Sequence, residues 1–530
     1  MQENYDYIVI GAGSAGCVVA ARLSENGRHS VLVLEAGVRD SNPWIHIPLG
    51  FGKTFFNRSL NWCFSAEPSP ELGGRSVFTP CGKVLGGSSS INGLVYSRGQ
   101  REDFESWRQD GNVGWGYDDV LPFFRKSENQ QHGESTFHGH AGPLAVSDVM
   151  DCHPLGRAFV ESANAAGYLS NKDFNGATQE GVGAFQVTAR DGKRVSSAVA
   201  FLRDAERRPN VCLKINAEVD RLAIDGRRIT GVTYAVNGVS LTALAKRAVI
   251  LSAGAINSPA VLQRSGIGPS DWLHQAGIEV RHELRGVGAN LQDHPQARLA
   301  IRSRTPTLNT QMRHPMHLLR IGLQYAFFRR GPLASSGGQT GGFLRSRPDV
   351  DRPDFMYFFM PFTSLDLRKG LDPFPGFTIA SVLLHPESRG FVRVRSANPE
   401  DAPIIQPNCL HADNDRQAML AGLRTARRIA SKDPLLQQIE REERPGAAVT
   451  GDEDLLSYIR ATASSAYHHC GTCKMGSGDD AVVDSRLRLR GLDGLVVADA
   501  SIMPTIVSSG TNPASIMIGE RAAAFLLAEE

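Results

Sequence analysis

Hydrophobic residues at the start of the chain form two short runs with a helix-like segment between them. Residues 5–10 (YDYIVI) have the composition of a β-strand, residues 17–24 (CVVAARLS) carry apolar positions at helical spacing, and residues 30–34 (SVLVL) form a second apolar run. The segment 11–16, which joins the first run to the helix, reads Gly-Ala-Gly-Ser-Ala-Gly. This order of strand, glycine turn, helix and strand predicts an α/β unit with a parallel sheet.

Three glycines and one acidic residue in this unit have the spacing of a dinucleotide-binding fold. Gly11 permits a tight turn, Gly13 leaves room for a pyrophosphate, and Gly16 lets the helix approach the strand closely. Glu35 follows nineteen residues after Gly16, where a carboxylate binds a ribose hydroxyl. The alternative is a glycine-rich turn without a ligand. The flanking strands and the position of the acid favour nucleotide binding.

The hydrophobic pattern changes along the middle of the chain and returns at its end. We first expect strands at 210–216, 219–224, 228–234 and 248–251, and then a helix that opens at a proline, at 258–265. Further along we expect strands at 355–362 and 390–395 and a helix at 416–431. Residues 495–498 and 513–527 then resume the first pattern as a strand and a closing helix. One domain is therefore predicted to be built from discontinuous segments, with a second, sheet-containing domain inserted into it.

Composition narrows the class of protein. The chain has 530 residues, of which 41% are hydrophobic and 21% charged, so it is neither largely disordered nor a fibre. Lys and Arg number 57 and Asp and Glu 55, and the basic residues are scattered, so no nucleic-acid partner is expected. The N-terminus lacks the pattern of a signal peptide. A protein of a reducing compartment is the expectation.

Two further segments bear on membranes and on thiol chemistry. No apolar run reaches the roughly 18 residues of a membrane span, and residues 316–328, interrupted by Arg320 and Gln324, are predicted to form an amphipathic helix. Cys470 and Cys473 form the one Cys-x-x-Cys, without a second pair that would complete a zinc site. No metal is expected. A redox dithiol at this pair remains an alternative.

A second glycine cluster, residues 82–93 (GKVLGGSSSING), combines glycines and serines between apolar anchors. Such a run supplies many backbone N–H groups and hydroxyls at one place, which suits an extended polar cofactor. A flexible linker is the alternative, but the anchoring Val84, Leu85 and Ile91 argue against it.

Five segments together resemble the glucose–methanol–choline oxidoreductases, flavoproteins that bind FAD and oxidise alcohols. They are GAGSAG at 11–16, GKVLGGSSSING at 82–93, GAINSPAVLQRSGIG at 254–268, GVGANLQDHP at 286–295, and the tail YHHCGTCKMG…VADAS…TNPASIMIGER. The resemblance extends over nearly the whole chain and is nearest to choline-dehydrogenase-like alcohol dehydrogenases. It implies an α/β (α+β overall) fold with a discontinuous Rossmann-like FAD-binding domain and a substrate domain built on a mainly antiparallel sheet. We expect the first at 1–155, 210–300 and 462–530, and the second at 156–209 and 301–461.

The resemblance also implies roles for individual residues. His468 matches the catalytic histidine, and Asn512 matches the second polar residue of the reaction centre. The expected FAD-binding residues are Gly11, Gly13, Ser14, Ala15, Gly16, Glu35, Gly87, Ser88, Asn92, Gly93, Val219, Asp499, Ala500 and Asn512. Relatives that tether FAD covalently carry a histidine immediately before the asparagine of the glycine–serine loop. Ile91 occupies that position here, so FAD is expected to be non-covalent.

Local physics is compatible with these roles and leaves some alternatives open. His468 and His469 are adjacent, so on an extended segment only one of them faces the flavin, and His469 is expected at the surface or behind its neighbour. Asn512 precedes Pro513, which is also the sequence of a helix start with asparagine as N-cap. A helix N-terminus at this position would favour negative charge.

The substrate side is less defined by the sequence. The alternation in 355–362 either presents Phe355, Tyr357 and Phe359 to a cavity or buries them in a sheet core. Gln339 lies where choline-oxidising relatives carry a glutamate. A quaternary ammonium needs an anionic or aromatic partner, so a glutamine there speaks against choline. Gln339, Phe359 and Tyr467 are the candidate pocket residues.

The resulting prediction is a dehydrogenase that oxidises a primary alcohol to the aldehyde. A cyanohydrin-type lyase of the same family, choline dehydrogenase proper, and a non-catalytic flavin-binding module are the alternatives. The acceptor of the electrons is left open between oxygen, a quinone and a respiratory carrier. A cytoplasmic protein is expected, with peripheral contact to the inner face of a membrane left open.

Overall fold

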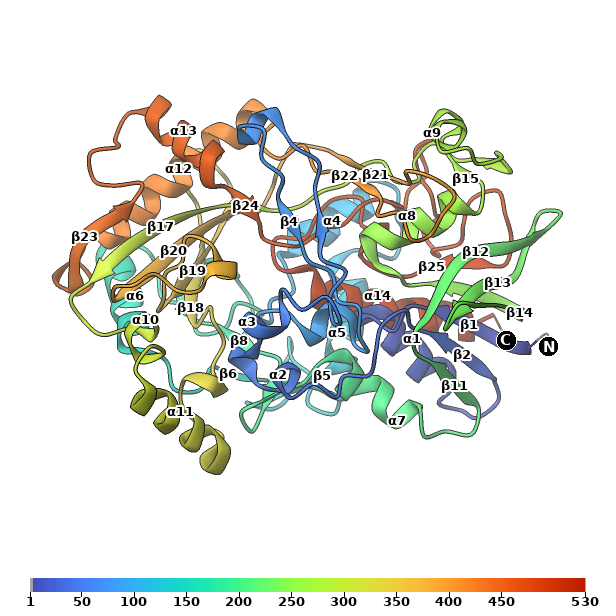
Figure 1. Cartoon of the computed structure of the whole chain (residues 1–530), viewed down its shortest axis with the longest axis horizontal. Helices are drawn as coiled ribbons and strands as arrows, with labels where there is room; N and C mark the ends of the chain where they lie inside the picture. Colours follow the sequence, from blue (N-terminus) through green and yellow to red (C-terminus); the bar gives the residue numbers. More distant parts are fainter. Residues whose placement is uncertain (1–2, 530) are drawn as a thin grey trace.

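Two large sheets lie toward opposite ends of the elongated molecule (Figure 1). The computed structural model describes residues 3–529. The first sheet has the order β11-β2-β1-β14-β13-β12, with β25 beside β14. Its strands are β1 (Glu3–Ile10), β2 (Val31–Leu34), β11 (Val211–Lys214), β12 (Ala217–Asp225), β13 (Arg228–Val236), β14 (Val239–Leu251) and β25 (Leu495–Val497).

The long strand β14 joins a parallel and an antiparallel part of this sheet. Its C-terminal half pairs in parallel with β1 and β25, and its N-terminal half pairs antiparallel with β13. The turn from β1 leads into α1 (Ser14–Leu23), which packs against the closing helix α14 (Thr511–Leu527). Gly519 permits this approach, because a Cβ there would lie 2.7 Å from the carbonyl oxygen of Ala15. The first and last segments of the chain therefore share one core.

The second sheet is antiparallel and has the order β23-β17-β20-β19-β18-β7, with β24 beside β17. Its strands are β7 (Gly181–Ala184), β17 (Pro295–Ser303), β18 (Thr340–Leu344), β19 (Phe355–Met360), β20 (Gly376–Leu383), β23 (Ile439–Arg444) and β24 (Ser464–Ser465). The helices α6 (Pro154–Ala165), α12 (Asp413–Ala430) and α13 (Asp452–Thr462) pack against it. The mixed α/β fold predicted from the sequence is confirmed. The domain boundaries stay a prediction.

Two predicted helix starts were wrong. Helix α8 (Gly254–Arg264) begins before Pro259, which therefore lies inside the helix. Proline cannot donate to the carbonyl four residues earlier, and the Thr472 hydroxyl donates to that oxygen of Ala255 instead, at 2.6 Å. Asn512 is not the N-cap of α14, since Gly510 precedes the helix and Asn512 lies in its first turn. The asparagine side chain is thereby available for other contacts.

The predicted helix at 316–328 is present as α11 (Pro315–Phe328), but its apolar residues mostly face solvent. No helix among residues 3–529 combines the length and the hydropathy that a bilayer crossing requires.

Candidate active site

A cavity of about 1000 Å³ is lined by residues of both large sheets and of the two glycine clusters. Most of the residues predicted from the sequence to bind the cofactor or act in catalysis line it. These are Gly11, Gly13, Ser14, Ala15, Glu35, Gly87, Ser88, Asn92, Gly93, Val219, His468, Asp499, Ala500 and Asn512. Gly16 does not line the cavity. The structure therefore brings together segments that are up to about 500 residues apart in sequence.

The first glycine cluster forms a close-packed cradle at the start of α1. Gly11 has a φ of +91°, and a Cβ at Gly16 would lie 1.9 Å from the Gly11 carbonyl oxygen. A Cβ at Gly87 would lie 2.8 Å from Cα of Gly13, so the second glycine cluster packs directly on the first. No side chain caps the N-terminus of α1. The N–H groups at the start of this helix are free, and the glycines leave space beside them. A pyrophosphate fits such a site.

The carboxylate of Glu35 lies buried at the end of β2. It accepts hydrogen bonds from the N–H groups of Ala12 at 2.9 Å and Gly37 at 2.8 Å. Burial raises the pKa of Glu35 to about 7, against the two N–H donors, which act to lower it. Each carboxylate oxygen keeps a second lone pair. Glu35 thus fixes the glycine turn and can still accept from a ribose hydroxyl.

The side chain of Asn92 is oriented by an arginine that the sequence did not single out. Arg194 is buried, and its guanidinium donates to Oδ1 of Asn92 at 2.6 Å and to its carbonyl oxygen at 2.7 Å. Because arginine only donates, the amide oxygen of Asn92 faces Arg194 and its NH₂ group is available to the cavity. Burial lowers the pKa of Arg194 to about 9. A guanidinium held without a carboxylate partner gives the glycine–serine loop a positive environment.

Asp499 and Asn512 lie at two further helix starts. The buried Asp499 carboxylate accepts from the N–H of Gly254, at the start of α8, at 2.8 Å and from the Ser258 hydroxyl at 2.5 Å. The Ser14 hydroxyl donates to Oδ1 of Asn512 at 2.7 Å. With its oxygen occupied in this way, Asn512 has its NH₂ group free to donate. The N-termini of α1 and α14 meet at this contact, and both favour negative charge.

His468 takes part in a chain of hydrogen bonds that fixes its protonation pattern. Nδ1 of His468 lies 2.9 Å from Nδ1 of His294, and Nε2 of His294 lies 3.2 Å from the carbonyl oxygen of Leu384. A carbonyl only accepts, so His294 donates from Nε2 and accepts at Nδ1. His468 must then donate from Nδ1, which leaves its Nε2 without a proton. Such a tautomer has its basic lone pair on Nε2.

The basic nitrogen of His468 lies close to the start of α14, the helix whose first turn bears Asn512. A Cβ built on Gly510 would lie 3.3 Å from His468 Nε2, and Gly510 is two residues before Asn512. Burial lowers the pKa of His468 to about 4, although the nearby Asp293 acts to raise it. The imidazole is therefore neutral at physiological pH and can accept a proton.

Asp293 organises both histidines of the pair. Its Oδ1 accepts from the backbone N–H groups of His294 at 2.8 Å and His468 at 2.9 Å, and its Oδ2 accepts from the Ser465 hydroxyl. Nε2 of His469 lies 3.3 Å from Oδ2 of the same carboxylate, without hydrogen-bond geometry. His469 is buried, so its expected position at the surface was wrong, and it lines the cavity together with His468. In the sequence, Asp293 and His294 were noted only as part of the segment 286–295, without a role in the site.

The residues of β19 divide between the core and the cavity. Phe355, Tyr357 and Phe359 are buried in the core of the second sheet, where Phe359 packs on Phe159 and Phe377. Met356, Phe358 and Met360, on the opposite face, line the cavity. Successive side chains of a strand point to opposite faces. Of the two alternatives, burial in the sheet core is therefore the correct one for these three residues, and the prediction that Phe359 belongs to the pocket was wrong.

Of the other two candidate pocket residues, one reaches the cavity and one does not. Gln339 is buried outside it, accepting from the N–H of His153 at 2.7 Å and donating to the Ser335 hydroxyl at 2.9 Å. Tyr467 lines the cavity beside Phe55, with ring centroids 5.0 Å apart. Its φ of +67° is unusual for a tyrosine and turns the chain directly before His468.

Neither the Cys-x-x-Cys pair nor a metal-binding cluster forms a competing site in the part of the chain that the structure describes. Cys470 and Cys473 are fully buried, and burial raises the pKa of both thiols, which disfavours a reactive thiolate. Among residues 3–529 no group of three or more His, Cys, Asp or Glu side chains is arranged to hold a metal ion.

Comparison with known proteins yields consistent matches over the whole chain. The GMC oxidoreductase family models match residues 5–296 and 386–519. An alcohol dehydrogenase [acceptor] of Pseudomonas putida is 43% identical over 529 residues, covering 99% of this chain and 96% of that protein. An oxygen-dependent choline dehydrogenase of Brucella suis biovar 1 is 41% identical, covering 98% and 95%. A formate oxidase structure of Aspergillus oryzae, from work on FAD modification, superposes with a TM-score of 0.92 at 26% identity, covering 100% and 99%.

Proposed function

Because the chain belongs to the GMC oxidoreductase family, we propose that His468 and Asn512 carry out its FAD-dependent oxidation of a primary alcohol to the aldehyde. The observation that carries this proposal is the Nε2 lone pair of His468, which is fixed by His294 beside the start of α14. A neutral base thus lies in the same cavity as the two glycine clusters.

The residues that line the cavity would hold FAD as the sequence predicts. The cradle at the start of α1 would take the pyrophosphate, Glu35 the ribose, and Gly87, Ser88, Asn92 and Gly93 the flavin. Val219 would pack near the adenine, and Asp499 with Ala500 would lie beside the ribityl–pyrophosphate stretch. We propose residues 1–155, 210–300 and 462–530 as the FAD-binding domain, and 156–209 and 301–461 as the substrate domain. When bound, FAD supplies the acceptor for a hydride.

His468 prepares the alcohol to release that hydride. A neutral alcohol is a poor hydride donor, whereas alkoxide character on its oxygen drives the C–H electron pair out. Nε2 of His468 accepts the hydroxyl proton, the C–H bond breaks with loss of hydride, and the carbon–oxygen bond becomes the aldehyde carbonyl. General-base help of this kind contributes about 10²–10⁴ in rate.

Asn512 and the helix that bears it stabilise the charge that develops on the substrate oxygen. The amide NH₂ of Asn512 is left free by the hydrogen bond from Ser14 to its oxygen. The N-terminus of α14 adds a positive potential at the same place. Preorganised donors of this kind cost no reorganisation during the reaction.

The walls of the cavity accept an apolar chain, and the charge of Arg298 favours an uncharged alcohol over choline. Met356, Phe358 and Met360 line one wall, and Phe55 and Tyr467 line another. Among the described strands of the second sheet, Arg298 is the one ionisable residue that lines the cavity. A guanidinium repels a quaternary ammonium, and Gln339, where a carboxylate would serve choline, lies outside the cavity.

An alcohol panel under anaerobic conditions tests the function. We expect a primary alcohol with an apolar chain to bleach the flavin of the purified holoenzyme, and choline to do so more slowly. A lyase or a non-catalytic flavin binder would stay yellow with every alcohol, and faster bleaching by choline would contradict the proposed specificity. The same reaction in air, with peroxide detection, distinguishes oxygen from a quinone or respiratory carrier as acceptor. We propose that a quinone or a respiratory carrier accepts the electrons, so that the enzyme is a dehydrogenase.

We expect FAD to be released intact when the protein is denatured. Ile91 lies buried against the cavity at the position of the tethering histidine, and its side chain has no nucleophilic atom. Acid or heat precipitation should leave all yellow colour in the supernatant. Flavin that stays with the precipitate would show a covalent link elsewhere.

Replacing His294 is expected to slow catalysis through His468, since His294 is a positioning residue. In His294→Ala the Nδ1–H of His468 loses its acceptor, so the proton can move to Nε2. We expect anaerobic flavin reduction to slow by about 10–100-fold with FAD still bound. His294→Asn, which restores an acceptor oxygen, should recover part of the rate, whereas a merely structural role would give equal losses in both variants.

A further inference from the structure

Helix α11 presents apolar side chains to solvent along the side opposite to its attachment. Met316, Leu319, Leu323 and Phe327 follow one another at spacings of three and four residues and are 65%, 56%, 48% and 76% exposed. Side chains at such spacing share one face of a helix. Leu318 and Phe328 add further exposed apolar surface, at 42% and 72%. A contiguous apolar stripe of this kind marks an interaction site.

The helix is attached to the molecule by a narrow contact. Ile321 and Tyr325 are its two buried residues, and the Tyr325 hydroxyl donates to the carbonyl oxygen of Gly192 at 3.0 Å. In Figure 1, α11 projects at the lower left, away from the sheet above it. Helix α11 thus lies at the periphery of the molecule in this view, and its stripe is exposed to solvent.

Charge within the chain segment that carries the stripe is of one sign. Residues 304–340 contain no aspartate or glutamate and five arginines: Arg304, Arg313, Arg320, Arg329 and Arg330. Arg320 is exposed beside the stripe, and Arg330 is exposed just beyond its C-terminal end. A helix with apolar side chains toward one side and arginines around them has the character of an interfacial helix on an anionic bilayer.

We propose that the apolar stripe of α11, with Arg320 and Arg330, docks this protein on an anionic lipid bilayer. The bilayer fits both features, because its interior accepts the apolar side chains and its headgroups pair with the arginines. A second copy of the chain fits less well. A two-fold contact would oppose like charges across the interface.

The segment just before α11 contacts a loop that lines the cavity. Arg313, just before α11, donates to the carbonyl oxygen of Leu371 at 3.3 Å. In the same loop, Ser364 and Leu367 line the cavity, while Leu365 is 70% exposed. An alcohol or acceptor dissolved in the bilayer would therefore reach the cavity along this loop. That consequence rests on the proposed function, whereas the docking itself does not.

Vesicle sedimentation with the holoenzyme tests the proposal without turnover. We expect binding to vesicles of phosphatidylglycerol and phosphatidylcholine and much weaker binding to phosphatidylcholine alone. The triple variant Leu319→Ser, Leu323→Ser, Phe327→Ser should lower affinity for the anionic vesicles by at least about tenfold. Arg320→Gln with Arg330→Gln should lower it by about fivefold for each arginine.

A matched control replaces exposed apolar residues elsewhere. Val113→Ser, Leu169→Ser and Leu436→Ser, at positions 80%, 78% and 47% exposed, should leave vesicle binding unchanged. Absence of wild-type binding, or equal binding by the α11 triple variant, would overturn the proposal. So would a wild-type dimer in analytical ultracentrifugation that the α11 triple variant converts to a monomer, since the stripe would then be an interface between copies. Retained FAD absorbance shows that each variant is folded.

Discussion

Replacement of His468 by alanine is expected to slow anaerobic flavin reduction by at least about 100-fold while FAD stays bound. The variant loses the base whose Nε2 is kept unprotonated by the hydrogen bond from Nδ1 to His294, 2.9 Å long. It keeps the cradle, Glu35 and Asn92, which form the cofactor site. The loss corresponds to about 3–5 kcal/mol of activation free energy. Stopped-flow mixing with a saturating primary alcohol measures it.

The adjacent histidine supplies the control. His469→Ala should change the same rate by less than about tenfold, because His469 also lines the cavity but its Nε2 lies beside Asp293 and not at the start of α14. If His469→Ala proved the slower variant, the base would be assigned to the wrong histidine.

The lowered pKa of His468, about 4, also predicts a pH profile. The base is neutral well below pH 7, so the wild-type rate should be level from about pH 6 to 8 and fall only in more acidic solution.

The parts of this site that the sequence predicted are those carried by neighbouring residues. The turn at 11–16 is specified by glycines whose replacement would make a side chain collide with the backbone. A Cβ on Gly16, for example, would lie 1.9 Å from the carbonyl oxygen of Gly11. Glu35 follows from its place at the end of β2. The resemblance to the family added His468 and Asn512.

The residues that orient these groups were not predictable, because they lie far away in the chain. Arg194 is 102 residues from Asn92, and His294 is 174 residues from His468. An isolated arginine or histidine has no local pattern that identifies its partner. The same limit applied to strand 355–360, whose alternation defines two faces without indicating which one meets the cavity. Helix α11 is a second example of this limit, because its apolar spacing predicts a stripe on one face but does not indicate whether another part of the protein covers that face.

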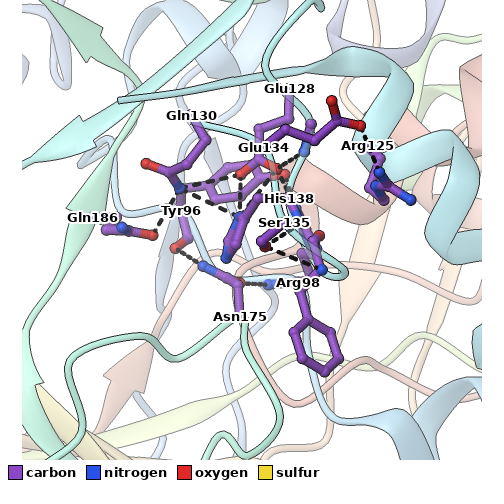
Figure 2. A network of polar contacts seen from close by, with 12 residues as sticks. Tyr96, Arg98, Arg125, Glu128, Gln130, Glu134, Ser135, His138, Asn175 and Gln186 are labelled. Atoms are coloured by element: carbon purple, nitrogen blue, oxygen red, sulfur yellow. Dashed lines mark hydrogen bonds and ion pairs between the residues drawn. The ribbon is translucent and has the colours of Figure 1, made fainter. Parts of the chain in front are cut away.

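A buried network of charges around Glu128 predicts a large effect on stability. Arg98, six residues after Asn92, donates to Oε2 of Glu128 at 2.5 Å, and both side chains are almost inaccessible to solvent. His138 lies 3.0 Å from Oε1 of the same carboxylate (Figure 2). The N–H of Gly139 also donates to Glu128. This carboxylate therefore balances positive groups that have no access to water.

Glu128→Gln is expected to lower the free energy of unfolding by about 3–5 kcal/mol, because it leaves the Arg98 charge buried without its partner. Shifts in the urea midpoint measure the loss. Glu134→Gln is the matched control. The Arg125–Glu134 pair nearby is 36% and 64% exposed, so its removal should cost no more than about 1 kcal/mol (Figure 2). Equal losses in the two variants would show that burial of the network is unimportant.

The pH dependence of stability gives the network a second signature. Burial alone would lower the pKa of His138, but hydrogen bonds to Asp173 and Glu128 outweigh it and raise the pKa to about 9. A raised pKa stabilises the folded state most below the unfolded value of about 6.5, and the contribution is lost as pH rises through about 9. Wild-type stability should therefore fall between these pH values. His138→Gln should be less stable at pH 6.5 and lack most of that slope, since the titrating imidazolium that both carboxylates stabilise is absent.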